Sequence, residues 1–153
     1  MLLVGVLELS TGSPFEPGRT LRSSGVELEL SSDVKVELDL FEFSEEEQVF
    51  LAREFPEAAY PETARDEGFL MLVALGPVKA KLCPPAKLTV PNSRNLDPGT
   101  ELSIYAHSTD VEAEFAPYGE WAPVSDATVS EDGQTIVTDA GQGLPFLSVI
   151  GIK

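Results

Sequence analysis

The sequence predicts a mainly β fold, an antiparallel two-sheet β-sandwich with one short helix. Short apolar–polar alternations recur throughout residues 84–152, and Pro-Asn, Pro-Gly-Thr and Asp-Gly turns separate them. Proline and glycine number 12 each in the 153 residues. Proline disrupts helix interiors and central strands, so this content favours many short strands joined by turns. We expect one domain over residues 1–153, with nine to eleven strands.

Strand periodicity recurs in the first part of the chain. Residues 2–9 are an apolar run that predicts a first strand. In residues 26–30 and again in 34–40, apolar side chains alternate with charged ones, which is typical of half-buried strands. Residues 31–33, Ser-Ser-Asp, predict the turn between them. The apolar parity reverses at residues 41–43, which indicates a bulge.

One segment has the signals of a helix rather than a strand. Ser44 is an N-cap candidate, and Glu47 follows it at the spacing of a capping box. Glutamates fill the first turn, and Pro56 ends the segment. The sequence therefore predicts a short helix over residues 44–55. Residues 10–25, which are rich in serine, proline and glycine, and residues 56–67, which are polar and contain proline, predict loops.

The second half of the chain is richer in strand signals. Residues 68–75 form the one continuous apolar run, which predicts a central strand buried on both faces and ended by Gly76-Pro77. Alternation at residues 78–82 and 102–106 predicts further strands. Asp132-Gly133 predicts a hairpin turn.

The charge balance restricts the partners. Aspartate and glutamate total 26 against 10 lysines and arginines, a net charge of -16. Such a chain repels nucleic acid and anionic lipid, so we expect neither as a partner. It favours solubility, cationic partners or divalent ions, and the simplest interpretation is a solvated acidic surface.

Cysteine content and hydropathy restrict the class further. Cys83 is the single cysteine, so no disulfide forms within the chain. It precedes Pro84-Pro85, and we expect a small buried hydrophobe at a strand end. No segment approaches the ~20 apolar residues of a membrane span, so we expect no membrane insertion. The start lacks a basic region before its apolar run, which predicts a cytoplasmic protein or a module of a longer exported chain, at the cell surface or secreted.

The order of turn motifs in residues 67–152 resembles the ZU5 β-sandwich module of large bacterial surface and secreted proteins. The residues that carry the resemblance are Gly68, Gly76-Pro77, Pro85-Ala86, Leu88 to Asn92, Pro98 to Leu102, Trp121, Val129-Ser130, Asp132-Gly133, Asp139, Gly141 and Gly143. The resemblance covers somewhat over half of the chain. It implies a spacer, scaffold or interaction domain.

The resemblance also implies one candidate reaction. Related sandwich domains include members that cleave themselves at a His-x-Ser or His-x-Thr step. In this chain Thr109 would be the nucleophile, His107 the base, and the bond between Ser108 and Thr109 the one cleaved. Such tripeptides are common by chance, and a surface histidine on the outer face of its strand is the favoured interpretation.

Other chemistry has weaker support. Carboxylates cluster in residues 39–47 and 126–132, but no spaced calcium loop is present. Phe115, Tyr118 and Trp121 are a candidate sugar-stacking platform, although packing is the commoner role, and we expect Trp121 to be partly buried. No nucleophile elbow, zinc ligand set or phosphate-binding glycine loop is present, so we expect no cofactor and no metal.

The sequence thus favours a non-catalytic structural or protein–protein interaction module over an enzyme. Its expected contact surface is a sheet edge, where backbone groups lack partners. The expected partner is a second protein or another copy of the chain. Self-cleavage through His107 and Thr109, and carbohydrate or calcium binding, are the alternatives.

Overall fold

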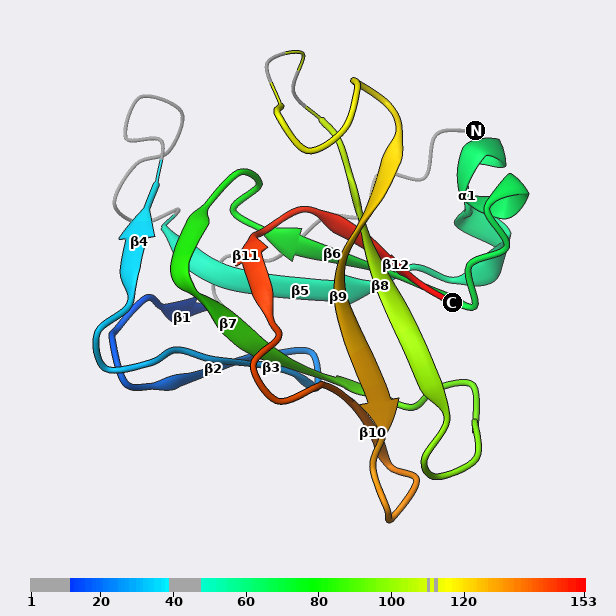
Figure 1. The fold of residues 1–153 in the computed structure, drawn as a ribbon, viewed down its shortest axis with the longest axis horizontal. Coiled ribbons are helices and arrows are strands. Elements are labelled where there is room, and N and C mark those ends of the chain that lie inside the picture. Colours follow the sequence, from blue (N-terminus) through cyan, green and yellow to red (C-terminus); the bar gives the residue numbers. More distant parts are fainter. Residues whose placement is uncertain (1–11, 39–47, 110, 112) are drawn as a thin grey trace.

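The computed structural model describes residues 12–38, 48–109, 111 and 113–153. Twelve strands lie in this part of the chain, with a 3₁₀ turn (Glu57–Ala59) and one short helix, α1 (Glu62–Asp66), between the fifth and sixth (Figure 1). The strands are β1 (Ser13–Pro14), β2 (Thr20–Ser23), β3 (Val26–Glu29), β4 (Lys35–Glu37), β5 (Val49–Glu54), β6 (Met71–Gly76), β7 (Lys81–Pro91), β8 (Glu101–His107), β9 (Trp121–Val129), β10 (Thr135–Thr138), β11 (Leu144–Phe146) and β12 (Val149–Ile152). The mainly β prediction is confirmed.

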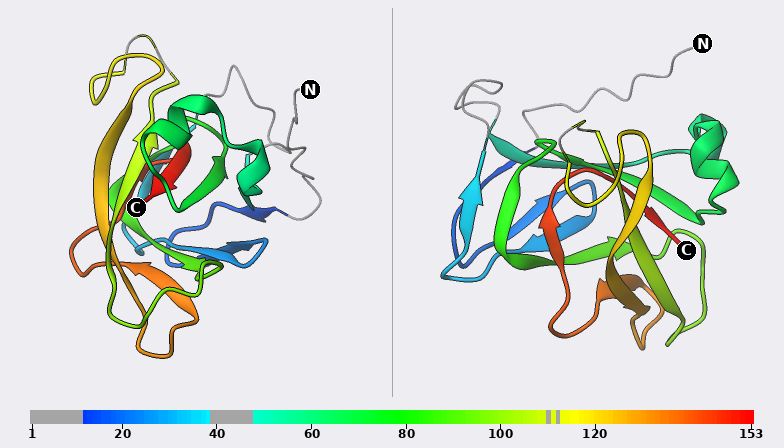
Figure 2. Two further views of the ribbon diagram at one scale, coloured as in Figure 1. Left: turned by 90° about the vertical axis from the view of Figure 1, so that its right-hand side faces the viewer. Right: turned by 45° about the horizontal axis from the view of Figure 1, so that its top comes forward.

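The strands form one antiparallel sheet that curves until it nearly closes. Its order is β1-β5-β6-β12-β8-β9-β10-β7-β3-β2, and β4 and β11 both pair with the first part of β7. Two separate sheets facing each other, as the sequence predicted, are not confirmed. The two further views in Figure 2 show the sheet wrapping around its own interior.

Serine side chains help to close the gap between the two ends of the sheet. The amide of Ala52 in β5 donates to Ser23 Oγ in β2 at 2.9 Å. Ser13 Oγ in β1 donates to the carbonyl of Arg22 at 2.9 Å and accepts from its amide at 3.3 Å. These bonds satisfy backbone groups that a strand-to-strand ladder would otherwise pair.

The core lies inside the curved sheet, and α1 covers a smaller cluster outside it. Met71, Val73 and Leu75 of β6 join the main core, whereas Leu72 joins the outer cluster with Tyr60, Ala64 and Phe69. Successive side chains of a strand point to opposite faces, so a strand with a core on each side must be apolar throughout. This explains the continuous apolar run and confirms the predicted central strand.

The predicted helix over residues 44–55 is wrong where the structure describes it. Residues 49–54 form β5, which pairs with β1 on one side and β6 on the other. Burial of Phe50, Leu51 and Ala52 between these strands outweighs a local capping signal. Residues 44–47 lie outside the described part, as do the strand predicted at 2–9 and the bulge at 41–43.

Two segments predicted as loops contain regular structure. Residues 10–25 include β1 and β2. Residues 56–67 include α1, which starts after Pro61, has Glu62 in its first turn and buries Ala64. A helix of one turn leaves too short a pattern for periodicity to detect.

The Asp132-Gly133 hairpin turn is confirmed between β9 and β10. The Asp132 carboxylate accepts hydrogen bonds from Ser130 Oγ at 2.6 Å and from the Gln134 amide at 3.0 Å. The hydrogen bond from Ser130, followed by the one from Gln134, lowers the pKa of Asp132. Gly133 supplies the positive φ, 70°, that the turn requires.

Candidate functional site

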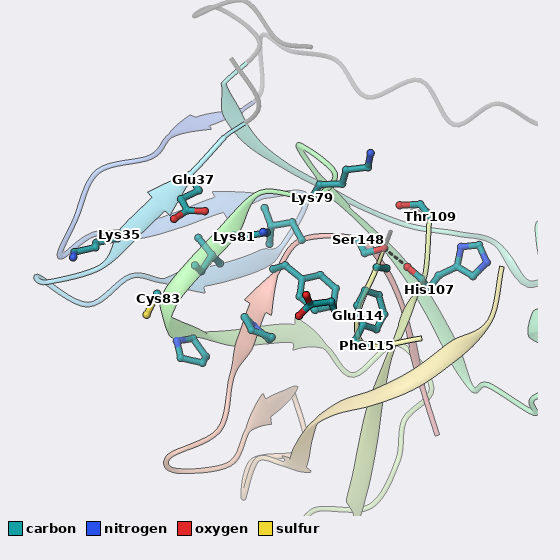
Figure 3. A pocket seen from close by; sticks show the side chains of 16 residues that line it. Lys35, Glu37, Lys79, Lys81, Cys83, His107, Thr109, Glu114, Phe115 and Ser148 are labelled. Carbon is teal, nitrogen blue, oxygen red and sulfur yellow. Dashed lines mark hydrogen bonds between the residues drawn. The ribbon is translucent and has the colours of Figure 1, made fainter. Parts of the chain in front are cut away.

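A groove of about 620 Å³ opens where β4, β7, β11 and the end of β8 meet. We call it the β7 groove. Its lining residues come from β4, β7, β11 and the segments next to them (Figure 3). They are Lys35 and Glu37 on β4, Lys79 just before β7, residues 81–83 and Pro85 on β7, His107 at the end of β8, Thr109, residues 113–115, and residues 145–148. A volume of this size lies within the range of small-molecule sites.

Strand pairing builds the floor of the groove. On β7, Leu82 is buried while Lys81 and Cys83 on either side of it are exposed, because side chains alternate between faces. Lys35 of β4 lies opposite Cys83, Glu37 opposite Lys81, and Phe146 of β11 opposite Lys81 from the other side. Side chains from three distant segments therefore share one outward face.

Aromatic contact builds the facing wall. The ring of Phe115 lies 4.6 Å from the ring of Phe146, centroid to centroid, at 35°. Phe115 is nevertheless 38% exposed. Pro85 and Pro145 extend this apolar surface. An exposed apolar surface whose rings are already packed on each other is a preorganised contact for another apolar group.

Lysines and glutamates line the groove together. Three of its lining residues are lysines, Lys35, Lys79 and Lys81, against two acids, Glu37 and Glu114. Elsewhere in the described residues, cations pair with carboxylates, as in Arg22 with Glu27, Arg94 with Glu57 and Lys153 with Glu67. No described residue forms an ion pair with Lys35 or Lys81. The carboxylate-bearing Glu37 nevertheless lies directly opposite Lys81 in the register of β4 on β7.

Cys83 is part of the groove, and its predicted burial is wrong. The thiol is exposed. The sequence interpretation placed a strand end at Pro84-Pro85, but β7 continues through both prolines and Cys83 falls on its outward parity. The groove escaped prediction because only the alternation of Lys79 and Lys81 was visible locally.

The structure does not place His107 and Thr109 as a base and its nucleophile. His107 lies on the outer face of β8, as predicted, where its Nε2 is 3.2 Å from the carbonyl of Gly119 and its ring is 4.7 Å from that of Trp121. Thr109 is exposed, and no hydrogen bond connects the two side chains among the described residues. In Figure 3 the imidazole points away from Lys35 and Cys83.

The bond that would be cleaved is held in regular backbone hydrogen bonds. The amide of Ser108 donates to the carbonyl of Glu120 at 2.8 Å, and the amide of Gly119 donates to the carbonyl of Ser108 at 2.9 Å. Ser108 is fully buried. The attacked carbonyl thus accepts a hydrogen bond from Gly119, and within the described part of the chain no hydrogen bond links the Thr109 hydroxyl to a base.

We expect the purified chain to remain whole. Denaturing electrophoresis should give a single band near 16.5 kDa that Thr109→Ala leaves unchanged, because His107 is held by Gly119. His107→Ala is the matched control. Two fragments in the wild type that merge into one band in both variants would contradict this expectation and restore self-cleavage.

The three candidate aromatic residues do not form one platform. Phe115 packs on Phe146, whereas Trp121 packs on Phe69 at 4.6 Å and on His107. Tyr118 is 67% exposed and takes part in neither contact. The partial burial predicted for Trp121 is confirmed, and its indole N–H has no hydrogen-bond partner among the residues that the structure describes.

Two further possibilities are a metal site and a membrane-spanning helix. There, no group of three or more His, Cys, Asp or Glu side chains is placed to hold a metal ion. The carboxylates predicted to cluster at residues 39–47 lie outside the described part. None of the described helices combines the length and hydropathy that crossing a membrane requires.

Comparison with protein-family models, curated proteins and solved structures found no match to this chain. The ZU5-like assignment therefore stays a prediction from turn motifs.

Proposed function

We propose that the chain is a non-catalytic binding module and that the β7 groove is its contact surface. The observation that carries this proposal is a packed aromatic pair, the exposed Phe115 and the partly buried Phe146, beside the exposed side chains of Lys35 and Lys81. Binding sites are typically apolar hollows with a few placed polar groups. Catalysis would need a nucleophile and a base in contact, and His107 and Thr109 are not.

The paired strands that form the floor of the groove favour a binding role. β7 is the middle strand of a local three-stranded arrangement with β4 and β11. Its backbone also continues into the closed sheet through β10 and β3. A site built on paired strands loses little conformational entropy when it is occupied.

Self-association through a sheet edge is the second candidate. β4 pairs with β7 on one side, and no described strand pairs with its other side. However, β4 has three residues, and Lys35 and Glu37 on it are exposed. Short charged edge strands oppose pairing with another chain, so the groove is the stronger proposal.

A fragment screen followed by two-dimensional NMR tests the binding function. The screen should contain neutral, cationic and anionic aromatic fragments in equal numbers, without bias toward one charge. We expect the changes in amide chemical shift that the hits cause to concentrate at residues 81–83 and 113–115. These changes should weaken when Phe115→Ala removes the exposed ring. Tyr118→Ala, which removes an exposed aromatic ring outside the groove, should leave them unchanged. Hits spread over the surface, or none, would overturn the proposed function.

A further inference from the structure

We propose that β4 pairs with β4 of a second copy of this chain, antiparallel and about a twofold axis that passes beside Val36. The inference goes beyond ligand binding in the β7 groove and gives self-association a defined register. The pairing uses the edge of β4, whereas the groove opens on the face of that strand, so the two roles are compatible.

The edge of β4 that points away from β7 is free in the part of the chain that the structure describes. There, β4 pairs with β7 and with no other strand. Among the described residues, none outside β7 forms a hydrogen bond with residues 35–37. Figure 1 shows β4 at the periphery of the ribbon. The backbone donors and acceptors of such an edge are a template for one more strand.

The order of charges on β4 suits an antiparallel copy of the same strand. Lys35 and Glu37 have opposite charges, lie two residues apart and are both exposed. When Val36 lies opposite the partner's Val36, Lys35 lies opposite the partner's Glu37. The twofold axis repeats this contact, so each dimer has two pairs of opposite charge. Directly opposite side chains have Cβ atoms about 4.5–5.5 Å apart, where opposite charges stabilise the pairing and like charges destabilise it.

The register of β4 on β7 extends this row of charges. Glu37 lies directly opposite Lys81 of its own chain. In the dimer, Glu37 therefore lies between Lys81 on one side and the partner's Lys35 on the other. A parallel pairing in register would instead place each charge against its own copy, which is unfavourable. The charges that oppose pairing with an unrelated strand thus favour this one partner.

Val36 supplies the apolar part of the contact. It is half-buried and packs against the main core. Its exposed part would meet the partner's Val36 on the inner face of the strand, away from the charges. Each copy uses its β4 edge once, so the contact closes at two copies. Because β4 has three residues, the interface is small, and we expect a weak dimer that dissociates on dilution.

Sedimentation of the full chain from about 1 μM to about 1 mM measures this equilibrium. A salt concentration of about 0.15 M limits the repulsion between two chains to a range of about 8 Å. We expect monomer at the low end, dimer at the high end and no larger species. In NMR spectra of the native chain, the amide shifts of residues 35–37 should change with concentration, whereas those of residues 20–23 in β2 should stay constant.

Charge reversals test the register. Lys35→Glu and Glu37→Lys each replace two attractive pairs by two repulsive ones, so each should weaken the dimer about tenfold or more. The two substitutions change the net charge in opposite directions, which excludes general repulsion as the common cause. Combined, they recreate pairs of opposite charge at the wild-type net charge, and most of the wild-type affinity should return. Lys87→Glu, at an exposed lysine of β7 that pairs with Glu29, is the matched control and should have no effect.

Three results would overturn the inference. They are a monomer at every concentration, a dimer that the single reversals leave unchanged, and a double variant that associates no better than the single ones. Circular dichroism verifies that each variant is folded, and the NMR shifts of the native chain decide the question if a reversal impairs folding. The fragment screen tests the groove separately. A monomer that binds fragments in the groove overturns the dimer alone, and a dimer that binds none overturns the proposed function alone.

Discussion

Replacing Phe50 by alanine is expected to lower the free energy of unfolding by about 3–5 kcal/mol, the usual cost of removing a buried aromatic ring from a core. Phe50 is 0% exposed and belongs to the main core. It lies on β5, between β1 and β6, so neighbouring strands on both sides hold the backbone in place and limit collapse of the cavity. Chemical denaturation followed by circular dichroism measures the change.

Val111→Ala is the control for this measurement. Val111 is 81% exposed, and surface substitutions away from special features usually change stability by less than about 0.5 kcal/mol. A cost for Phe50→Ala no larger than that of the control would place the ring outside the core. It would thereby contradict the assignment of residues 49–54 to a buried strand.

The elements that the sequence predicts well are those whose pattern is complete within a few residues. β8 is one example, because Leu102, Ile104 and Ala106 are buried while the residues between them are partly exposed. β6 is another, because a run that is apolar on both faces has few alternatives to a central strand. The hairpin at Asp132-Gly133 depends on local turn chemistry alone.

Features that depend on distant residues were not predictable in this way. The hydrogen bond from the Ala52 amide to Ser23 Oγ joins residues 29 positions apart, and no local pattern marks either as a point where the sheet closes. For residues 49–54, a capping-box signal upstream argued for a helix. These residues form a strand because β5 pairs with β6, which is a tertiary interaction.

Only part of the groove can be predicted from the sequence. The alternation of Lys79, Ala80, Lys81 and Leu82 predicts two lysines on an outward face. Lys35 and Phe146 reach the same face only because β4 and β11 pair with β7 from opposite sides. A site assembled by register between segments more than 40 residues apart needs the topology before its residues can be grouped.

Replacing Gly151 by alanine is the second large effect that we expect, a loss of about 1–3 kcal/mol from overpacking. Gly151 lies in β12, opposite Leu72 of β6 and Tyr105 of β8. A Cβ on it would be 2.6 Å from the ring of Phe69, closer than such atoms ever approach. The ring has little room to move, because it also lies 4.6 Å from Trp121 and 5.6 Å from Tyr105.

A double-mutant cycle with Phe69→Ala identifies the cause of that loss. Phe69→Ala is destabilising in its own right, because the ring belongs to the cluster beneath α1. In its background, however, the added methyl group of Gly151→Ala meets no ring, and its cost should fall below about 0.5 kcal/mol. The coupling energy should therefore be about 0.5–3 kcal/mol, as found for residues in direct contact. If the cost of Gly151→Ala were the same in both backgrounds, the obstacle would be the strand pairing of β12 and not the ring that packs over it.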